Sequence, residues 1–237
     1  MREPGRNQAA SPASTRIILV RHGQSVTNAG GRAADQVSNS LTELGRAQAT
    51  QFAERLDCKP TRIIVSPFLR AQQTSEPLRQ RFPHVPVEEW PIQEFSFLNP
   101  ALHRGTSELD RESHVVAYWQ REDPAYSDGP EAESFTMFLD RARDAIRRLA
   151  DRQLATRDPD SCILVFTHGF FMQAIRMVLL FPHATDAELM ANFQRFHLLN
   201  LIQNIDSLEL GVRDGRIQLI GPAHQTDFTL QGAKSHV

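Results

Sequence analysis

The stretch Ile17-Ile-Leu-Val-Arg-His-Gly-Gln-Ser-Val-Thr-Asn28 decides the fold class that the sequence predicts. Its first four residues are apolar and mostly β-branched, which is typical of a short strand buried on both faces. Arg21 and His22 follow directly, so this strand ends in a guanidinium and an imidazole. Ligands of open α/β sheets bind at the carboxyl ends of the strands. We therefore expect this tip to form part of a binding site.

Two further apolar runs end in the same way. Residues 62–65 are short and β-branched, with Arg70 one short loop beyond them, and residues 161–167 lead directly to His168. Helical patterns follow the three predicted strands, with Thr42 as the expected N-cap of the first helix. This alternation predicts parallel strands whose tips share one crevice. The sequence thus predicts an α/β fold, with a three-layer α/β/α architecture and a mostly parallel central sheet.

The patterns in the rest of the chain are weaker. Residues 83–129 gather prolines and aromatic residues without a regular period, and we interpret them as a lid-like insertion with a helix around residues 107–120. Residues 131–152 show an amphipathic helical pattern. Strands are expected at 196–201, 207–212 and 216–220, with Asp214-Gly215 as a hairpin turn.

Composition fits one cytoplasmic domain, expected over residues 16–230. The 237 residues are 41% hydrophobic and carry a formal net charge of −2, which gives no basic field for nucleic acid. No stretch reaches the length of about twenty apolar residues that spans a membrane. The polar residues 1–15 are expected to form a disordered tail and not a signal peptide. We expect Cys58 and Cys162 to be free thiols.

Three more motifs follow the first one along the chain. They are Leu41-Thr42-x-x-Gly45-x-x-Gln48-Ala49, Ser66-Pro67-x-x-Arg70-Ala71-x-Gln73-Thr74 and Phe166-Thr167-His168-Gly169. Together with Arg21-His22-Gly23, Ser25 and Asn28, these motifs resemble the signature of the histidine phosphatase superfamily, the phosphoglycerate mutase-like enzymes. The resemblance runs from residue 16 to about residue 181, and it implies the phosphoglycerate mutase-like fold for a single catalytic domain.

The resemblance implies phosphoryl-transfer chemistry without a metal ion or a cofactor. His22 is the expected nucleophile, and Arg21 and Arg70 are expected to bind the phosphoryl oxygens. The two guanidinium groups disfavour a protonated imidazole, so His22 should stay neutral, and water should then hydrolyse the phosphohistidine. His168 is expected to donate a hydrogen bond to an equatorial phosphoryl oxygen. The other expected phosphate-binding residues are Gly23, Ser25, Asn28 and Gly169.

The leaving alcohol needs a proton, and the resemblance places the donor at Glu94. Glu88 and Glu89 are rivals close in sequence, but the strand-like pattern at residues 85–89 favours surface positions for them. Glu133 has two interpretations, a carboxylate at the pocket rim or a charge at a helix N-terminus. We expect Glu94 to be the acid.

The sequence leaves the natural substrate open. Glu94 is followed by Phe95-Ser96-Phe97, which lacks both the family's usual glycine and the charged segment of the mutases. This favours a phosphomonoesterase over a phosphoglycerate mutase-type transferase, and a catalytically idle phosphate-binding regulator is the third hypothesis. The expected partner is a small phosphate ester, and a phosphoprotein fits if the rim is open; a monomer and a dimer are both compatible with the sequence. Four aromatic residues either line an apolar pocket or form the core of the lid: Phe95, Phe97, Tyr118 and Trp119.

Overall fold

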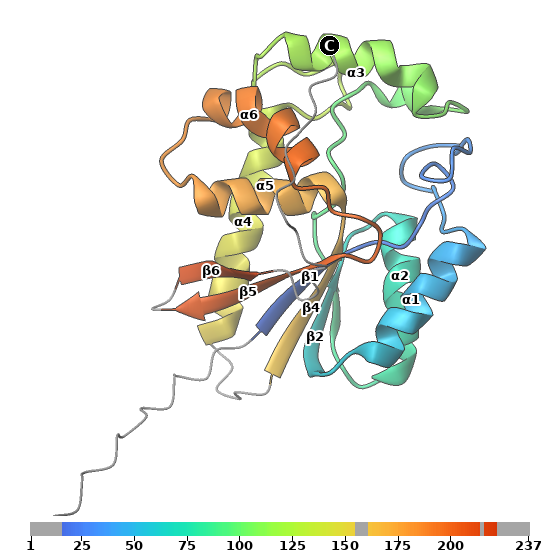
Figure 1. Cartoon of the computed structure of the whole chain (residues 1–237), viewed down its shortest axis with the longest axis vertical. Coiled ribbons are helices and arrows are strands. Elements are labelled where there is room, and N and C mark those ends of the chain that lie inside the picture. Colours follow the sequence, from blue (N-terminus) through green and yellow to red (C-terminus); the bar gives the residue numbers. More distant parts are fainter. Residues whose placement is uncertain (1–15, 155–160, 214–215, 222–237) are drawn as a thin grey trace, which may run out of the picture.

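The computed structural model describes residues 16–154, 161–213 and 216–221. The predicted N-terminal tail and the predicted turn at Asp214-Gly215 lie outside these residues. Within them, six strands form one sheet in the order β3-β2-β4-β1-β5-β6 (Figure 1). The strands are β1 (Arg16–Arg21), β2 (Lys59–Val65), β3 (Val87–Glu89), β4 (Ser161–Thr167), β5 (Ser207–Arg213) and β6 (Arg216–Gly221).

The predicted mostly parallel sheet is confirmed. Strands β1 to β4 run parallel to their neighbours among themselves, whereas β5 pairs antiparallel with β1 and β6 pairs antiparallel with β5. Arg21 of β1 lies opposite Thr167 of β4, and Val65 of β2 lies opposite Phe166. The residues that follow these three strands therefore leave the sheet at one edge.

Helices cover both faces of the sheet, as Figure 1 shows. On one face lie α1 (Glu43–Arg55) and α2 (Leu69–Arg81), and on the other lie α4 (Phe135–Leu154) and α5 (Gly169–Leu180). Ile18 and Val20 belong to the hydrophobic core beneath α1 and α2, whereas Ile17 and Leu19 belong to the core beneath α4 and α5. This alternation explains why the strand is apolar at every position, because both of its faces are buried.

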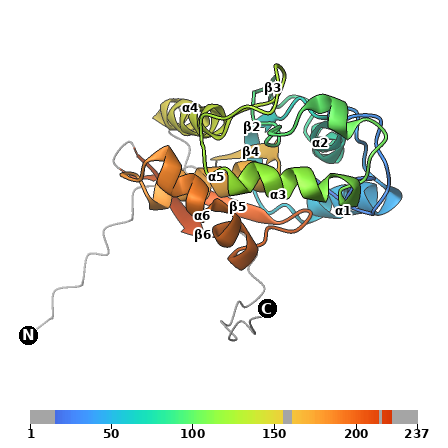
Figure 2. The same cartoon turned by 90° about the horizontal axis from the view of Figure 1, so that it is seen from above.

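Two more helices have no strand beneath them: one lies above the strand ends, and the other packs on α4 and α5. They are α3 (Glu112–Gln120) and α6 (Asp186–Leu199), and the 3-10 turns η1 (Pro100–His103) and η2 (Leu109–Arg111) precede α3. In Figures 1 and 2, α3 lies above the carboxyl ends of the parallel strands. Among the described helices, none is long and apolar enough to cross a membrane.

The helix starts follow their capping residues. The predicted N-cap Thr42 is confirmed, since its hydroxyl accepts a hydrogen bond from the Gly45 amide at 3.1 Å. Helix α4 begins at Phe135 and not at residue 131 as predicted. The hydroxyl of Ser134 accepts a hydrogen bond from the Met137 amide at 3.2 Å, so the helix has its side-chain cap at this later position.

The strand predicted at residues 196–201 is wrong, because most of this range is the last turn of α6. Short apolar runs do not distinguish a strand from the end of a helix by period alone. The decisive signal lies upstream, where Thr185 and Glu188 form a capping box. From that start, the helix buries Phe193 completely and leaves Leu198 exposed.

Cys58 and Cys162 form a disulfide, which corrects the prediction of free thiols. Cys58 directly precedes β2, and Pro60 of β2 lies opposite Cys162 of β4. The two Cα atoms therefore come within 6.4 Å, a distance that a disulfide spans. The cysteines are 104 residues apart in sequence, so only the strand order brings them together. The bond joins the amino ends of two strands, at the opposite edge of the sheet from the predicted site.

Candidate active site

A cavity of about 760 Å³ opens at the carboxyl ends of the parallel strands. Most of the predicted site residues line it, namely Arg21, His22, Ser25, Asn28, Arg70, Glu94 and Gly169. Gly23 and His168 are buried and do not line the cavity. The fold thus brings the predicted residues together from β1, α2, α5 and the loop after β3.

The hydrogen bonds of His22 fix its tautomer. Its Nδ1 lies 2.7 Å from the carbonyl oxygen of Gly23, which only accepts, so Nδ1 carries the proton. Nε2 accepts a hydrogen bond from Nε of Arg70 at 3.1 Å, so this nitrogen presents its lone pair. Burial, followed by the positive charges of Arg70 and Arg21, holds the pKa of His22 well below its ordinary value. The imidazole is therefore neutral at pH 7, and the electron pair on Nε2 accepts the hydrogen bond from Arg70.

The two arginines are anchored by backbone carbonyls. Nη1 of Arg70 donates to the carbonyl oxygen of Gln36 at 2.8 Å, and Nη1 of Arg21 donates to that of Ile202 at 2.5 Å. Burial lowers the pKa of Arg70 to about 10, which leaves it charged at neutral pH. A Cβ atom at Gly169 would lie 3.4 Å from Nε of Arg21, so the glycine allows the guanidinium to pack close to the start of α5.

His168 lies next to His22. Its ring centroid is 5.1 Å from that of His22, and its Nε2 is 2.7 Å from the hydroxyl of Ser66. Burial is the main cause that lowers the pKa of His168 well below its ordinary value, and the charge of Arg70 adds to it. The second histidine is therefore also neutral at pH 7.

Glu94 faces the arginines from the loop after β3. Its carboxylate accepts hydrogen bonds from the amides of Phe95 and Phe170, with Oε1 at 3.1 Å from each nitrogen. Because Phe170 lies in the first turn of α5, the carboxylate caps a helix N-terminus, where the helix dipole favours negative charge. Its charge is one of those that stabilise the protonated forms of Arg21 and Arg70.

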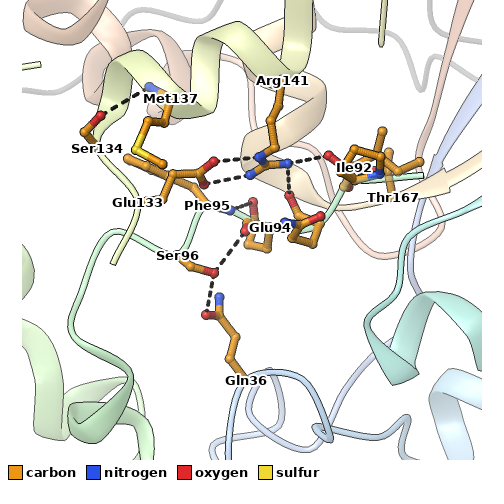
Figure 3. Close-up of polar contacts among 12 residues, drawn as sticks. Gln36, Ile92, Glu94, Phe95, Ser96, Glu133, Ser134, Met137, Arg141 and Thr167 are labelled. Atoms are coloured by element: carbon orange, nitrogen blue, oxygen red, sulfur yellow. Dashed lines mark hydrogen bonds and ion pairs between the residues drawn. The ribbon is translucent and has the colours of Figure 1, made fainter. Parts of the chain in front are cut away.

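Glu133 does not line the cavity. It pairs with Arg141 of α4 through two hydrogen bonds of 2.6 and 2.7 Å (Figure 3). Nη1 of the same guanidinium donates to the carbonyl oxygens of Pro91 at 2.8 Å and Gln93 at 3.1 Å. From the other side, the hydroxyl of Thr167 donates to the Ile92 carbonyl at 2.6 Å. The backbone that carries Glu94 is therefore held between α4 and the end of β4.

The two alternative proton donors, Glu88 and Glu89, lie outside the cavity. Glu88 and Glu89 belong to β3, where Glu88 pairs with Arg62 and Glu89 accepts a hydrogen bond from Gln72 at 3.2 Å. Neither side chain lines the cavity. Glu89 is exposed, as the strand-like pattern favoured, whereas the side chain of Glu88 is half-buried against Arg62.

The aromatic residues of the insertion lie where the cavity meets the core. Phe95 and Phe97 line the cavity. Tyr118 is only 2% exposed, and Trp119 stacks on Phe193 with centroids 5.5 Å apart. Phe95 is also only 2% exposed and stacks on Phe138 with centroids 4.3 Å apart. The core interpretation therefore holds for Tyr118 and Trp119, the pocket interpretation holds for Phe97, and Phe95 belongs to both.

The loop before β5 contributes contacts that no local sequence pattern indicates. The Asn204 amide donates to the carbonyl oxygen of His22 at 3.0 Å and to the side chain of Asn28 at 3.2 Å. The next residue, Ile205, has a φ of 69° and donates its N–H to the carbonyl oxygen of Arg21 at 3.1 Å. Asn204 lies 182 residues from His22, so no local spacing links them.

The sequence model of the histidine phosphatase superfamily (branch 1) matches residues 17–209, and this chain therefore belongs to that family. A metal-independent phosphoserine phosphatase from Arabidopsis thaliana is 28% identical over 198 residues, which cover 81% of this chain and 80% of that protein. A glucosyl-3-phosphoglycerate phosphatase from Mycobacterium tuberculosis is 28% identical over 169 residues, covering 70% and 75% of the two chains. The native structure of a mycobacterial glucosyl-3-phosphoglycerate phosphatase matches with a TM-score of 0.67 and 25% identity, over 88% of this chain and 98% of that one.

The buried neutral histidines make stability depend on pH. Because folding lowers the pKa of both His22 and His168, the unfolded chain binds more protons below its own histidine pKa of about 6.5. The free energy of unfolding should therefore fall as pH falls below this value, by up to about 1.4 kcal/mol per pH unit for each histidine. Urea unfolding at pH 7.5 and 5.5 measures the difference. His168→Gln should reduce the pH dependence, whereas the exposed control His183→Gln should keep it; equal dependence in all three proteins would contradict the expectation.

Proposed function

We propose that this chain is a phosphomonoesterase that acts without a metal ion and forms a phosphohistidine on His22. One observation carries the proposal: the lone pair of a neutral imidazole lies beside Arg70 in a cavity that Arg21 also lines. A phosphate ester repels nucleophiles by its negative charge. Two guanidinium groups reduce this repulsion when they bind the phosphoryl oxygens, and they orient the phosphorus for in-line attack.

In the first proposed step, Nε2 of His22 attacks phosphorus, so that a P–N bond forms as the ester P–O bond breaks. Arg70 transfers its Nε hydrogen bond from Nε2 to a phosphoryl oxygen, which frees the lone pair. Glu94 is a carboxylate before substrate binds; it takes up a proton when the anionic ester binds beside it, and it gives this proton to the leaving alkoxide. His168 has a buried Nδ1 with no hydrogen-bond partner among the described residues, and this nitrogen would donate to an equatorial oxygen once the phosphoryl group lies against His22.

In the second step, the Glu94 carboxylate takes a proton from water as the water oxygen attacks the phosphohistidine. The P–N bond breaks, inorganic phosphate forms, and both His22 and protonated Glu94 are regenerated. The related phosphatases support water as the acceptor. A mutase would pass the phosphoryl group to a second alcohol, and an idle regulator would hold phosphate without turnover.

Replacement of His22 tests the nucleophile. His22→Ala should reduce kcat by at least about a thousandfold, while inorganic phosphate and vanadate still bind, because both arginines remain. Brief mixing of the wild-type protein with a labelled phosphate ester should trap an acid-labile, base-stable phosphoenzyme. The surface variant His114→Ala serves as the control. Residual turnover in His22→Ala near the wild-type rate, or label on another residue, would refute the assignment.

Replacement of Glu94 tests the acid. Glu94→Gln should lower kcat for alkyl phosphates by about 10²–10⁴-fold, because their alkoxides need a proton to leave. The loss for p-nitrophenyl phosphate should be far smaller, because its phenolate leaves unprotonated. Glu89→Gln on β3 is the matched control and should leave both rates unchanged. Equal losses on the two substrates would reject Glu94 as the proton donor.

Arg141 is expected to act as a positioning residue for Glu94, through the backbone that it holds. Arg141→Ala should lower kcat for alkyl phosphates by up to about a hundredfold, with little change in the affinity for inorganic phosphate. The same substitution should have little further effect in the Glu94→Gln background, since Arg141 acts through that carboxylate. Arg143→Ala, on the same helix but paired with Asp186, is the control. Additive losses in the double mutant would show that Arg141 contributes independently of Glu94.

A further inference from the structure

The outer part of the cavity is built from side chains that the proposed phosphoryl transfer does not use. On one side, η2 and α3 carry them above the strand ends (Figure 2), and on the other side they come from α5 and the chain before β5. We call this surface the apolar wall: Leu109, Val115, Val116, Phe170, Leu201 and Ile202. A cavity of about 760 Å³ falls within the range of sites that enclose whole small molecules, so it has room for much more than a phosphoryl group.

Three members of the apolar wall are unusually open to solvent. Leu109 is 78% exposed, Val116 is 47% exposed and Leu201 is 54% exposed. Single exposed apolar residues are common, but several around one opening mark a surface that a ligand covers. The wall is continuous with the arginines that would hold the phosphoryl group, so a bound ester places its alcohol part against it.

The charges near the apolar wall are mainly negative. Asp35, Glu108 and Glu112 contribute carboxylates to the cavity lining. Arg21, Arg70 and Arg111 are the cations among the described lining residues. Because Arg21 and Arg70 would hold the phosphoryl group, Arg111, which donates to the hydroxyl of Thr106 at 2.7 Å, is the one left to balance the three carboxylates. Burial lowers the pKa of the lining residue His197 to about 4, so its ring adds no charge at neutral pH. A second anionic group on a substrate would meet repulsion here.

We propose that the alcohol part of the natural substrate is apolar and carries no negative charge. The inference rests on the proposed function, in which Arg21 and Arg70 bind the phosphoryl group, and it adds the chemical class of the leaving alcohol. Phosphoglycerates and bisphosphates are disfavoured because their additional negative charge would face the three carboxylates. Alkyl or aryl phosphate monoesters are favoured because they cover the exposed side chains of the apolar wall.

The binding test uses His22→Ala, which retains the arginines, and calorimetry with ethyl, butyl and hexyl phosphate. The Kd should fall by up to about fourfold for each added methylene, and 3-phosphoglycerate should bind more weakly than butyl phosphate. In the wild-type protein, kcat/KM should follow the same order. A Kd that is flat or rises with chain length would overturn the inference. A complete lack of turnover, including with p-nitrophenyl phosphate, would instead overturn the proposed function, while the binding series still decides the leaving group.

Substitutions in the apolar wall test whether this surface causes the dependence of Kd on chain length. Leu109→Ser and Val116→Ser should reduce the gain per methylene, whereas Leu44→Ser should not, because Leu44 is 54% exposed on α1 and does not line the cavity. Glu112→Gln should raise the affinity for 3-phosphoglycerate and leave that for hexyl phosphate unchanged. If the wall variants keep the wild-type chain-length dependence, the alcohol part binds elsewhere and the inference fails.

Discussion

The parallel register between β1 and β4 is the constraint on which the arrangement of the site depends. Arg21 lies opposite Thr167, and a histidine follows each of these two residues. The register therefore brings His22 and His168 together, with their ring centroids 5.1 Å apart. The hydrogen bond from the His22 amide to the Thr167 carbonyl, at 3.1 Å, continues the pairing beyond the end of β1. A slip of one residue would exchange the two buried faces of the strand and separate the rings. The apolar residues that hold the register therefore also set the spacing of the ionisable groups.

Local patterns were sufficient to predict β1, β2 and β4 and the residues at their tips. The run at residues 17–20 is apolar at every position because two different cores meet it, and that feature is visible without any distant contact. The N-cap at Thr42 was predictable for the same reason, since its partner is the amide three residues ahead. Short-range physical causes leave short-range signals in a sequence.

Contacts between distant segments were not predictable in this way. The disulfide joins cysteines 104 residues apart, and Arg141 reaches the carbonyl of Pro91 across 50 positions. Backbone carbonyls and amides take part in many of these contacts, and nearly every residue type supplies both, so composition does not indicate which residues will form them. The mistaken strand at residues 196–201 has a different cause, because the apolar end of a helix and a strand share the same short pattern.

Ile205 has a strained backbone conformation that lowers the stability of the fold and helps to position Arg21. A left-handed backbone at a β-branched residue costs on the order of 1–3 kcal/mol, and it persists only where the surroundings impose it. Here the imposing contacts are those that hold the backbone of Arg21, through the amide of Ile205 and the carbonyl of Asp206. Asparagine and glycine adopt this conformation more easily, so selection for a more robust protein has a simple route at this position. At Ile205, a substitution that relieves the backbone strain would raise the stability of the fold, but it must keep the hydrogen bonds that position Arg21.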